Sequence, residues 1–194
     1  MILENILIYF VIIPLLMLAG LAVCRNMNQI RTVMTVLSTI LLGLSIYLCV
    51  DFLAIRAAGN VEPMLYMASW NWYEPLNIKL SLGVDGISVL MIMLSAIIVF
   101  AGTFASWKIS PLPKNFFLWF ALLSMGVFGF FISIDIFTMF MFYEVALIPM
   151  YLLIGVWGTG RKEYSAMKLT LMLMGGSAFL MLGLLGIYWH SAPE

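Results

Sequence analysis

Charged side chains are scarce in this sequence. Asp, Glu, Lys and Arg make up 9% of its 194 residues, against about 25% in an average soluble domain. Apolar side chains make up 64%, and the mean hydropathy is +1.12. Too little polar surface is available to cover a water-soluble globule. These values exclude an ordinary soluble domain and predict an all-α, polytopic membrane protein.

The sequence has no net charge and contains few histidines and cysteines. Nine basic residues balance nine acidic ones, and no basic stripe supports nucleic-acid binding. His190 is the only histidine, and Cys24 and Cys49 are the only cysteines, which is too few for a zinc or iron–sulfur site within this chain. We therefore expect that the chain binds no cofactor and no metal, and that both cysteines are free thiols.

Uncharged apolar runs of about 20 residues recur along the chain, and each is long enough to cross a hydrocarbon core of about 30 Å. The predicted spanning helices are Asn5–Cys24, Thr32–Val50, Gly86–Trp107, Phe116–Ile134, Ile136–Trp157 and Leu169–Trp189. The first run is not typical of a signal peptide, because Glu4 stands where a positive flank is expected and no A-x-A site follows. The chain thus divides into two helices (1–50), an extracytoplasmic loop (51–84) and the remaining helices (85–194).

Basic residues concentrate in alternate connections between these runs. Six of them lie between helices one and two, three and four, or five and six: Arg25, Arg31, Lys108, Lys114, Arg161 and Lys162. The opposite loops hold only Arg56 and Lys79. Because loops rich in Lys and Arg stay in the cytoplasm, we predict that the first set faces the cytoplasm and that both termini face outward.

The loop Asp51–Leu82 is the only sizeable extramembrane segment. Apolar residues alternate with polar ones around Trp70 and Trp72, and again around Leu80. This period of two predicts a short hairpin that turns near Glu74-Pro75. The tryptophans suit the membrane interface, so the loop is interpreted as a cover at the membrane surface. A docking surface for a neighbouring subunit is the alternative.

Two aspartates stand immediately before predicted helices. Asp85 precedes the third run and Asp135 precedes the fifth. A carboxylate at this position accepts hydrogen bonds from amide groups that the first turn leaves unpaired. We predict that both residues cap their helices, with a share in ion access as the alternative.

Glu144 is the unusual residue of the sequence. It lies eight positions into the fifth run, about 12 Å along the axis at about 1.5 Å per residue, and so near the middle of the bilayer. An acid at this depth is costly, and such residues normally face protein or water and mark ion pathways. The pattern favours proton or ion transfer by Glu144. A protonated glutamate that only donates a hydrogen bond to a neighbouring helix is the alternative.

Two features near this carboxylate support an ion pathway. Pro149 has no amide hydrogen and displaces the carbonyl of Val145, so a kink and a free carbonyl are expected beside Glu144. Tyr143 and Tyr151 add hydroxyl groups, and Tyr151 lies on the face of Glu144 at i+7. Both the free carbonyl and the hydroxyls can hold water.

Lys168 is the second candidate for proton translocation. It stands at the start of the sixth run, near the cytoplasmic end, where a lysine can extend its amine to the lipid headgroups. Along the membrane normal it is expected about 15 Å from Glu144, too far for a direct salt bridge. A water chain between the two is the functional alternative to simple extension toward the headgroups.

Three segments resemble a known family. They are LGVDGIS at 82–88, FYEVALIPMY at 142–151 and AMK at 166–168, and they are similar to the antiporter-like subunits of respiratory complex I, most of all to the type called chain M or chain 4. The resemblance covers most of the chain, as an N-terminal portion of a larger family member with an incomplete proton-channel repeat. In this family the glutamate at the position of Glu144 is a proton-path residue.

The resemblance implies a membrane-arm subunit of a proton-translocating NADH (or related donor):quinone oxidoreductase, whose redox centres lie in other subunits. The implied partners are the other membrane-arm subunits and the lipid bilayer. The implied location is a prokaryotic plasma membrane, in preference to the mitochondrial inner membrane. A subunit of a sodium/proton antiporter or a membrane-bound hydrogenase is one alternative, and an assembly module without transport is another.

Overall fold

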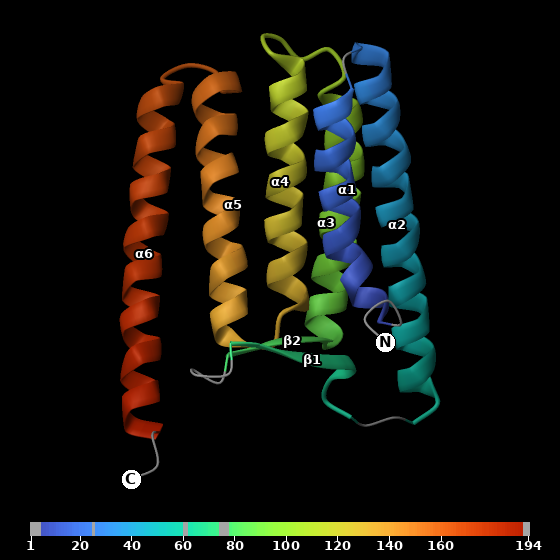
Figure 1. The fold of residues 1–194 in the computed structure, drawn as a ribbon, viewed down its shortest axis with the longest axis vertical. Coiled ribbons are helices and arrows are strands. Elements are labelled where there is room, and N and C mark those ends of the chain that lie inside the picture. The colour runs from blue at the N-terminus through green and yellow to red at the C-terminus, as the bar shows by residue number, and fades with distance from the viewer. Residues whose placement is uncertain (1–4, 25, 60–61, 74–77, 192–194) are drawn as a thin grey trace. The chain divides into compact units, whose positions relative to one another are not determined.

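The computed structural model describes residues 5–24, 26–59, 62–73 and 78–191. Its elements, in order, are a 3-10 turn Ile6–Ile8, α1 Tyr9–Val23, α2 Met27–Ala57, β1 Leu65–Tyr73, β2 Ile78–Val84, α3 Gly86–Ala105, α4 Pro113–Ile132, α5 Ile136–Trp157 and α6 Lys162–Ser191 (Figure 1). Within this described part of the chain, six helices are long and apolar enough to cross a membrane. The predicted polytopic, all-α architecture is confirmed.

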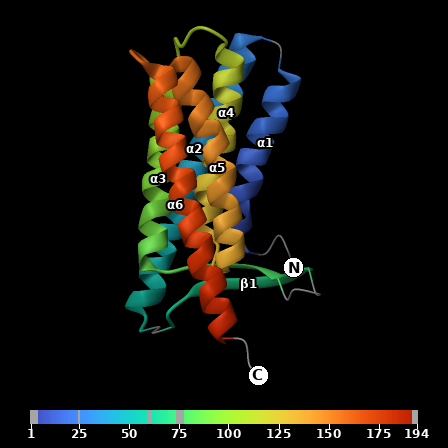
Figure 2. The same cartoon turned by 90° about the vertical axis from the view of Figure 1, so that its left-hand side faces the viewer.

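Two compact units make up the chain, Met1–Pro149 and Met150–Glu194. The first contains α1 to α4, the hairpin β1–β2 and most of α5. Its hairpin lies at one end of α1 to α4, and the α3–α4 connection lies at the other (Figures 1 and 2). The second contains the end of α5 and α6.

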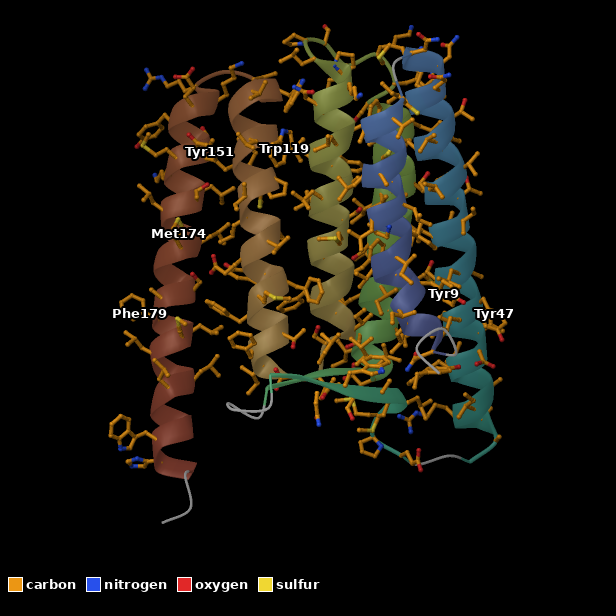
Figure 3. All side chains as sticks on the ribbon, viewed as in Figure 1. Tyr9, Tyr47, Trp119, Tyr151, Met174 and Phe179 are labelled. Atoms are coloured by element: carbon orange, nitrogen blue, oxygen red, sulfur yellow. The ribbon has the colours of Figure 1, made fainter. Side chains whose placement is uncertain are left out.

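The core of the first unit is built from apolar side chains that α1 to α4 turn toward one another. Phe10 of α1 and Phe128 of α4 are both fully buried, and their ring centroids are 5.6 Å apart. Apolar side chains also cover the outside: Leu90 of α3 is 58% exposed and Tyr47 of α2 is 59% exposed, and Tyr47 projects away from the bundle in Figure 3. Helices that are apolar on every face are typical of membrane spans.

Basic side chains bind the helix ends opposite the hairpin. Arg31 donates a hydrogen bond of 2.7 Å to the Trp107 carbonyl, and its guanidinium lies 5.3 Å from the Trp107 ring centroid. The Lys114 amine donates to the carbonyls of Cys24, at 2.7 Å, and Ala22, at 3.2 Å. Helix C-termini carry partial negative charge, so these cations neutralise the ends of α1 and α3. Cys24 itself is a free thiol, as is Cys49.

The predicted hairpin is confirmed. β1 and β2 are antiparallel, with pairs such as Trp70↔Leu80 and Ala68↔Leu82, and Trp70 packs partly against the core. The predicted turn at Glu74-Pro75 lies outside the described residues, as does the side chain of Trp72.

Three predicted helix boundaries were wrong because charges were taken as helix ends. α2 begins at Met27, before the predicted start at Thr32, since the Arg31 guanidinium has a hydrogen-bond partner in the Trp107 carbonyl. α2 continues to Ala57, past the predicted end at Val50, since the Asp51 carboxylate accepts a hydrogen bond from Tyr66 and is therefore tolerated in the helix. α6 begins at Lys162, before the predicted start at Leu169, because charged residues fit a helix that extends beyond the apolar core.

Candidate functional site

The connection between α4 and α5 is held by the hairpin. The Ile134 amide donates a hydrogen bond of 2.9 Å to the Ser81 carbonyl, and Leu82 forms a β-bridge with Ser133. Strand β2 therefore pairs with β1 on one edge and with this connection on the other. The position of the α4–α5 connection is thus fixed two residues before α5 begins.

Asp85 and Asp135 both cap helices, as predicted. Asp85 Oδ1 accepts the Ser88 amide at 2.7 Å, and Asp135 Oδ2 accepts the Thr138 amide at 3.1 Å. The hydrogen bonds from Ser88, side chain and backbone, lower the pKa of Asp85 below its usual value, although partial burial opposes them. Each carboxylate satisfies an amide that the helix start leaves unpaired.

Helices α4 and α5 pack closely at two glycines. A Cβ atom at Gly126 would lie 2.8 Å from Ala146 Cβ, and one at Gly129 would lie 2.3 Å from the Phe142 ring. Small residues allow this approach between membrane helices. Phe142 and Ala146 are four residues apart and so lie on one face of α5, which is the face that meets α4.

Glu144 lies on a different face of α5. It is two residues from both Phe142 and Ala146, which places it roughly 160–200° around the helix from them at about 3.6 residues per turn. Its side chain is half-buried. The residues that the structure describes provide neither a hydrogen bond nor an ion pair to this carboxylate. The site is therefore a mid-helix carboxylate turned away from α4.

Pro149 lies inside α5, as predicted, and its side chain is buried. Because proline has no amide hydrogen, the Val145 carbonyl, next to Glu144, lacks its usual helical donor. A free carbonyl one residue from the carboxylate can accept a hydrogen bond from water or from a protonated group. Tyr151, which is labelled in Figure 3, is 41% exposed.

Lys168 belongs to the second unit, whereas Glu144 belongs to the first. The lysine is exposed on α6 and lines an open hollow of about 430 Å³ with Tyr164, Met167, Leu171 and Met172. Lys162, one turn and a half earlier, donates a hydrogen bond of 2.7 Å to the Val156 carbonyl near the end of α5. The structure does not bring Lys168 and Glu144 together within one unit, and a proton-transfer role for Lys168 stays a prediction.

The sequence reasoning missed an anchor at Tyr66. Its hydroxyl donates to Asp51 Oδ2, and its carbonyl accepts from the Asn5 side chain at 2.6 Å. The backbone of Tyr66 has a φ of 57°, a region that costs a residue with a Cβ about 1–3 kcal/mol. Burial and the Asp51 carboxylate raise the pKa of Tyr66 well above its usual value. The only hint in the sequence is Asp51, which interrupts the apolar pattern of α2.

No group of three or more His, Cys, Asp or Glu residues that could hold a metal ion is found among the residues described. The prediction that this chain binds no metal or cofactor stays a prediction.

Three comparisons place this arrangement among known proteins. Residues 133–192 match the family "NADH:quinone oxidoreductase/Mrp antiporter, TM". The chain is 37% identical over 137 residues to NAD(P)H-quinone oxidoreductase chain 4 of the Angiopteris evecta chloroplast, covering 69% of this chain and 27% of the relative. It is 34% identical over 119 residues to chain 4 3 of the same enzyme from Picosynechococcus sp., covering 61% of this chain and 22% of that relative.

The fold is also seen in a solved structure. A chain of the membrane-bound sulfane sulfur reductase, an archaeal respiratory membrane complex, superposes with a TM-score of 0.74 over 96% of this chain and 38% of its own length, at 20% sequence identity. At that identity the likeness shows the fold alone.

This chain spans about a quarter of the length of the curated relatives that it matches. Glu144 and Lys168 both lie within the segment that matches the family, and no comparison assigns a role to either. The predicted resemblance is confirmed: the chain is an integral, multi-pass membrane protein similar, over most of its length, to the antiporter-like membrane subunits of complex I.

Proposed function

We propose that this chain contributes part of a proton path to the membrane arm of a redox-driven NADH (or related donor):quinone oxidoreductase, with Glu144 as its proton-exchanging group. One observation carries the proposal. The Glu144 carboxylate lies in the middle of the apolar helix α5, half-buried and away from the α4 contact, with no partner among the residues described. Ionisable groups at this depth are expensive and mark ion pathways.

The protonation state of such a group depends on nearby charge. A cation that approaches Glu144 from another membrane segment favours its ionised form, and withdrawal of the cation favours the protonated form. Water molecules would carry the proton to and from the carboxylate, and the free Val145 carbonyl can hold one of them by accepting its hydrogen bond. A redox reaction elsewhere in the assembly that moves a cation would therefore load and unload Glu144.

The partners follow from this proposal. Other membrane-arm subunits complete the path, and separate subunits hold the redox centres, so this chain binds no cofactor. Lys168 is the secondary candidate for proton transfer, at the basic end of α6. The setting we propose is a prokaryotic plasma membrane.

The name of the matching family supports a second candidate, because it includes Mrp antiporters. In that case the chain would contribute to sodium/proton exchange without an attached redox enzyme. A subunit of a membrane-bound hydrogenase is a further alternative. Purification of the intact assembly in mild detergent separates these functions. Flavin and iron–sulfur subunits in the same particle support the redox pump, and a particle without them contradicts it.

Substitution of the carboxylate tests the role of Glu144. We expect Glu144→Gln to reduce proton translocation about tenfold or more at unchanged assembly, because glutamine keeps the size but cannot exchange a proton. Glu144→Asp should retain part of the activity. The matched control is Glu163→Gln, at an exposed glutamate in the first turn of α6, which should leave translocation unchanged. Normal translocation by Glu144→Gln would contradict the proton-path role, and loss of assembly would indicate packing instead.

A further inference from the structure

The start of α5 is attached to the hairpin by backbone contacts. Ile134 donates its amide to the Ser81 carbonyl at 2.9 Å, and Ser133 pairs with Leu82. Two residues after Ile134, α5 begins, with Asp135 capping the Thr138 amide. The hairpin thus holds the short connection between α4 and α5, on which the direction of α5 depends.

The contact between hairpin and connection is closely fitted. A Cβ atom at Gly83 would lie 2.4 Å from Ile134 Cδ1 and 3.2 Å from Ile134 Cγ1, while both Gly83 and Leu82 are buried. A side chain at this position would require the end of the Ile134 side chain to move, so glycine allows the strand to lie directly against it. A shift of the hairpin at this point would therefore displace the α4–α5 connection directly.

The other strand of the hairpin is anchored to the helices. Near the start of β1 the pairing register shifts between Leu65 and Ala68, and within this irregular stretch Tyr66 has a positive φ. Its hydroxyl donates to Asp51 of α2, and its carbonyl accepts from Asn5, immediately before the 3-10 turn that leads into α1. One residue thus joins the hairpin to α2 and to the segment that leads into α1.

From these contacts we infer that the hairpin is a positioning element for Glu144: Tyr66 anchors it to α1 and α2, and Gly83 and Ser81 fix the α4–α5 connection and so the rotation and depth of α5. The inference rests on the proposed function of Glu144. A movement of the connection is transmitted along α5 to Glu144. Two contacts with α4 hold the helix there, Phe142 against Gly129 and Ala146 against Gly126, and Glu144 lies between these two residues in the sequence. Tyr66, Gly83 and Ile134 are positioning residues, since none of them is a proton carrier.

A complementary pair of substitutions tests the contact at Gly83. Gly83→Ala adds a methyl group where Ile134 Cδ1 lies, and Ile134→Val removes that methyl group. In the assembled complex, we expect Gly83→Ala to accelerate amide hydrogen exchange of residues 133–139 about tenfold, because overpacking opens the Ser81–Ile134 bond. It should also shift the pH profile of proton translocation per assembled complex. The double variant Gly83→Ala/Ile134→Val should restore both.

Two controls accompany the pair. Gly43→Ala, on α2, adds the same methyl group where nothing lies within 4 Å, and it should change neither measurement. Tyr66→Phe removes only the anchoring hydroxyl and should shift the exchange rate and the pH profile in the same direction as Gly83→Ala.

The two measurements separate this inference from the function on which it rests. Suppose that Glu144→Gln abolishes translocation, and that Gly83→Ala accelerates exchange at 133–139 but leaves the pH profile unchanged. This result would overturn the positioning role of the hairpin and leave the proposed proton-path function of Glu144 intact. Unchanged exchange in Gly83→Ala would overturn it as well. Normal translocation by Glu144→Gln would instead overturn the proposed function, and with it the positioning of a proton carrier. Reduced translocation at an unchanged pH profile would indicate a loss of stability alone, and it too would contradict positioning.

Discussion

Gly126→Ala is predicted to force α4 and α5 apart. The added Cβ atom would lie 2.8 Å from Ala146 Cβ and 3.0 Å from both the Ala146 amide nitrogen and the Phe142 carbonyl oxygen. Non-bonded carbon atoms are at their best separation about 3.5–4.0 Å apart, so the helices must separate by roughly 0.7–1.2 Å at this point. Two of the three nearest atoms belong to the backbone, and no side-chain rotation can relieve the contact.

The expected cost follows from two opposing effects. Overpacking of a closely packed contact costs about 1–3 kcal/mol, whereas alanine in place of glycine inside a helix is favourable by about 1 kcal/mol. We therefore expect Gly126→Ala to reduce stability by up to about 2 kcal/mol. Gly175→Ala, on α6, is the matched control, because nothing lies within 4 Å of its added Cβ atom and only the favourable effect remains.

Thermal unfolding of the purified assembly, followed by tryptophan fluorescence in one detergent, measures both variants. Gly126→Ala should lower the midpoint and Gly175→Ala should keep or raise it. Gly126→Ala/Ala146→Gly removes one of the conflicting methyl groups and should recover part of the loss. The packing argument is refuted if Gly126→Ala is as stable as the Gly175→Ala control.

Three further predictions concern the helix ends and the orientation. Asp85→Ala should destabilise the protein by about 1 kcal/mol because the Ser88 amide loses its acceptor, whereas Asp85→Asn should be nearly neutral; both are read from unfolding midpoints. The pKa of Asp85 in the folded protein lies below its usual 3.8. Its stabilising contribution is therefore fully present above about pH 4 and is lost as the pH falls through the lowered pKa. Asp85→Asn should accordingly make stability depend less on pH at acid pH. Single cysteines at Ser69 and Thr159, with Cys24 and Cys49 replaced, should react from outside and from inside sealed cells respectively, and equal reactivity at both would contradict the predicted orientation.

The regular elements could be predicted from the sequence because each depends on a local pattern. Uncharged runs of about 20 residues mark membrane spans, and α5 was predicted with its observed bounds, Ile136–Trp157. The period of two around Trp70 and Leu80 predicted the hairpin, which pairs these two residues. Asp85 and Asp135 could be recognised as caps since the cap and its helix are neighbours in the chain.

The remainder depends on residues that are distant in the chain. Tyr66 lies 15 residues after Asp51 and 61 after Asn5, and no local pattern connects these residues. The same holds for Gly83 and Ile134, since a glycine in a strand indicates only a close approach and does not name the group that approaches. The boundary errors at Arg31, Asp51 and Lys168 have a related cause: a charge ends an apolar run in the sequence, but a helix tolerates it once a hydrogen-bond partner or the membrane edge is near.

These distant contacts bear on how Glu144 could work as a proton carrier. The sequence identifies the carboxylate by its depth in an apolar run, but depth alone does not decide which groups it faces. In the first unit, the face of α5 that carries Phe142 and Ala146 is occupied by α4, so the orientation of Glu144 is set by this packing and by the connection that Ser81 holds. A proton carrier requires a fixed geometry toward its donor and its acceptor, since proton transfer takes place only within hydrogen-bond reach or through one water molecule. The glycines at 83, 126 and 129 allow close contacts on both sides of the α4–α5 connection. If Glu144 carries a proton as proposed, these contacts would hold that geometry, and substitutions far from the carboxylate are expected to alter its chemistry.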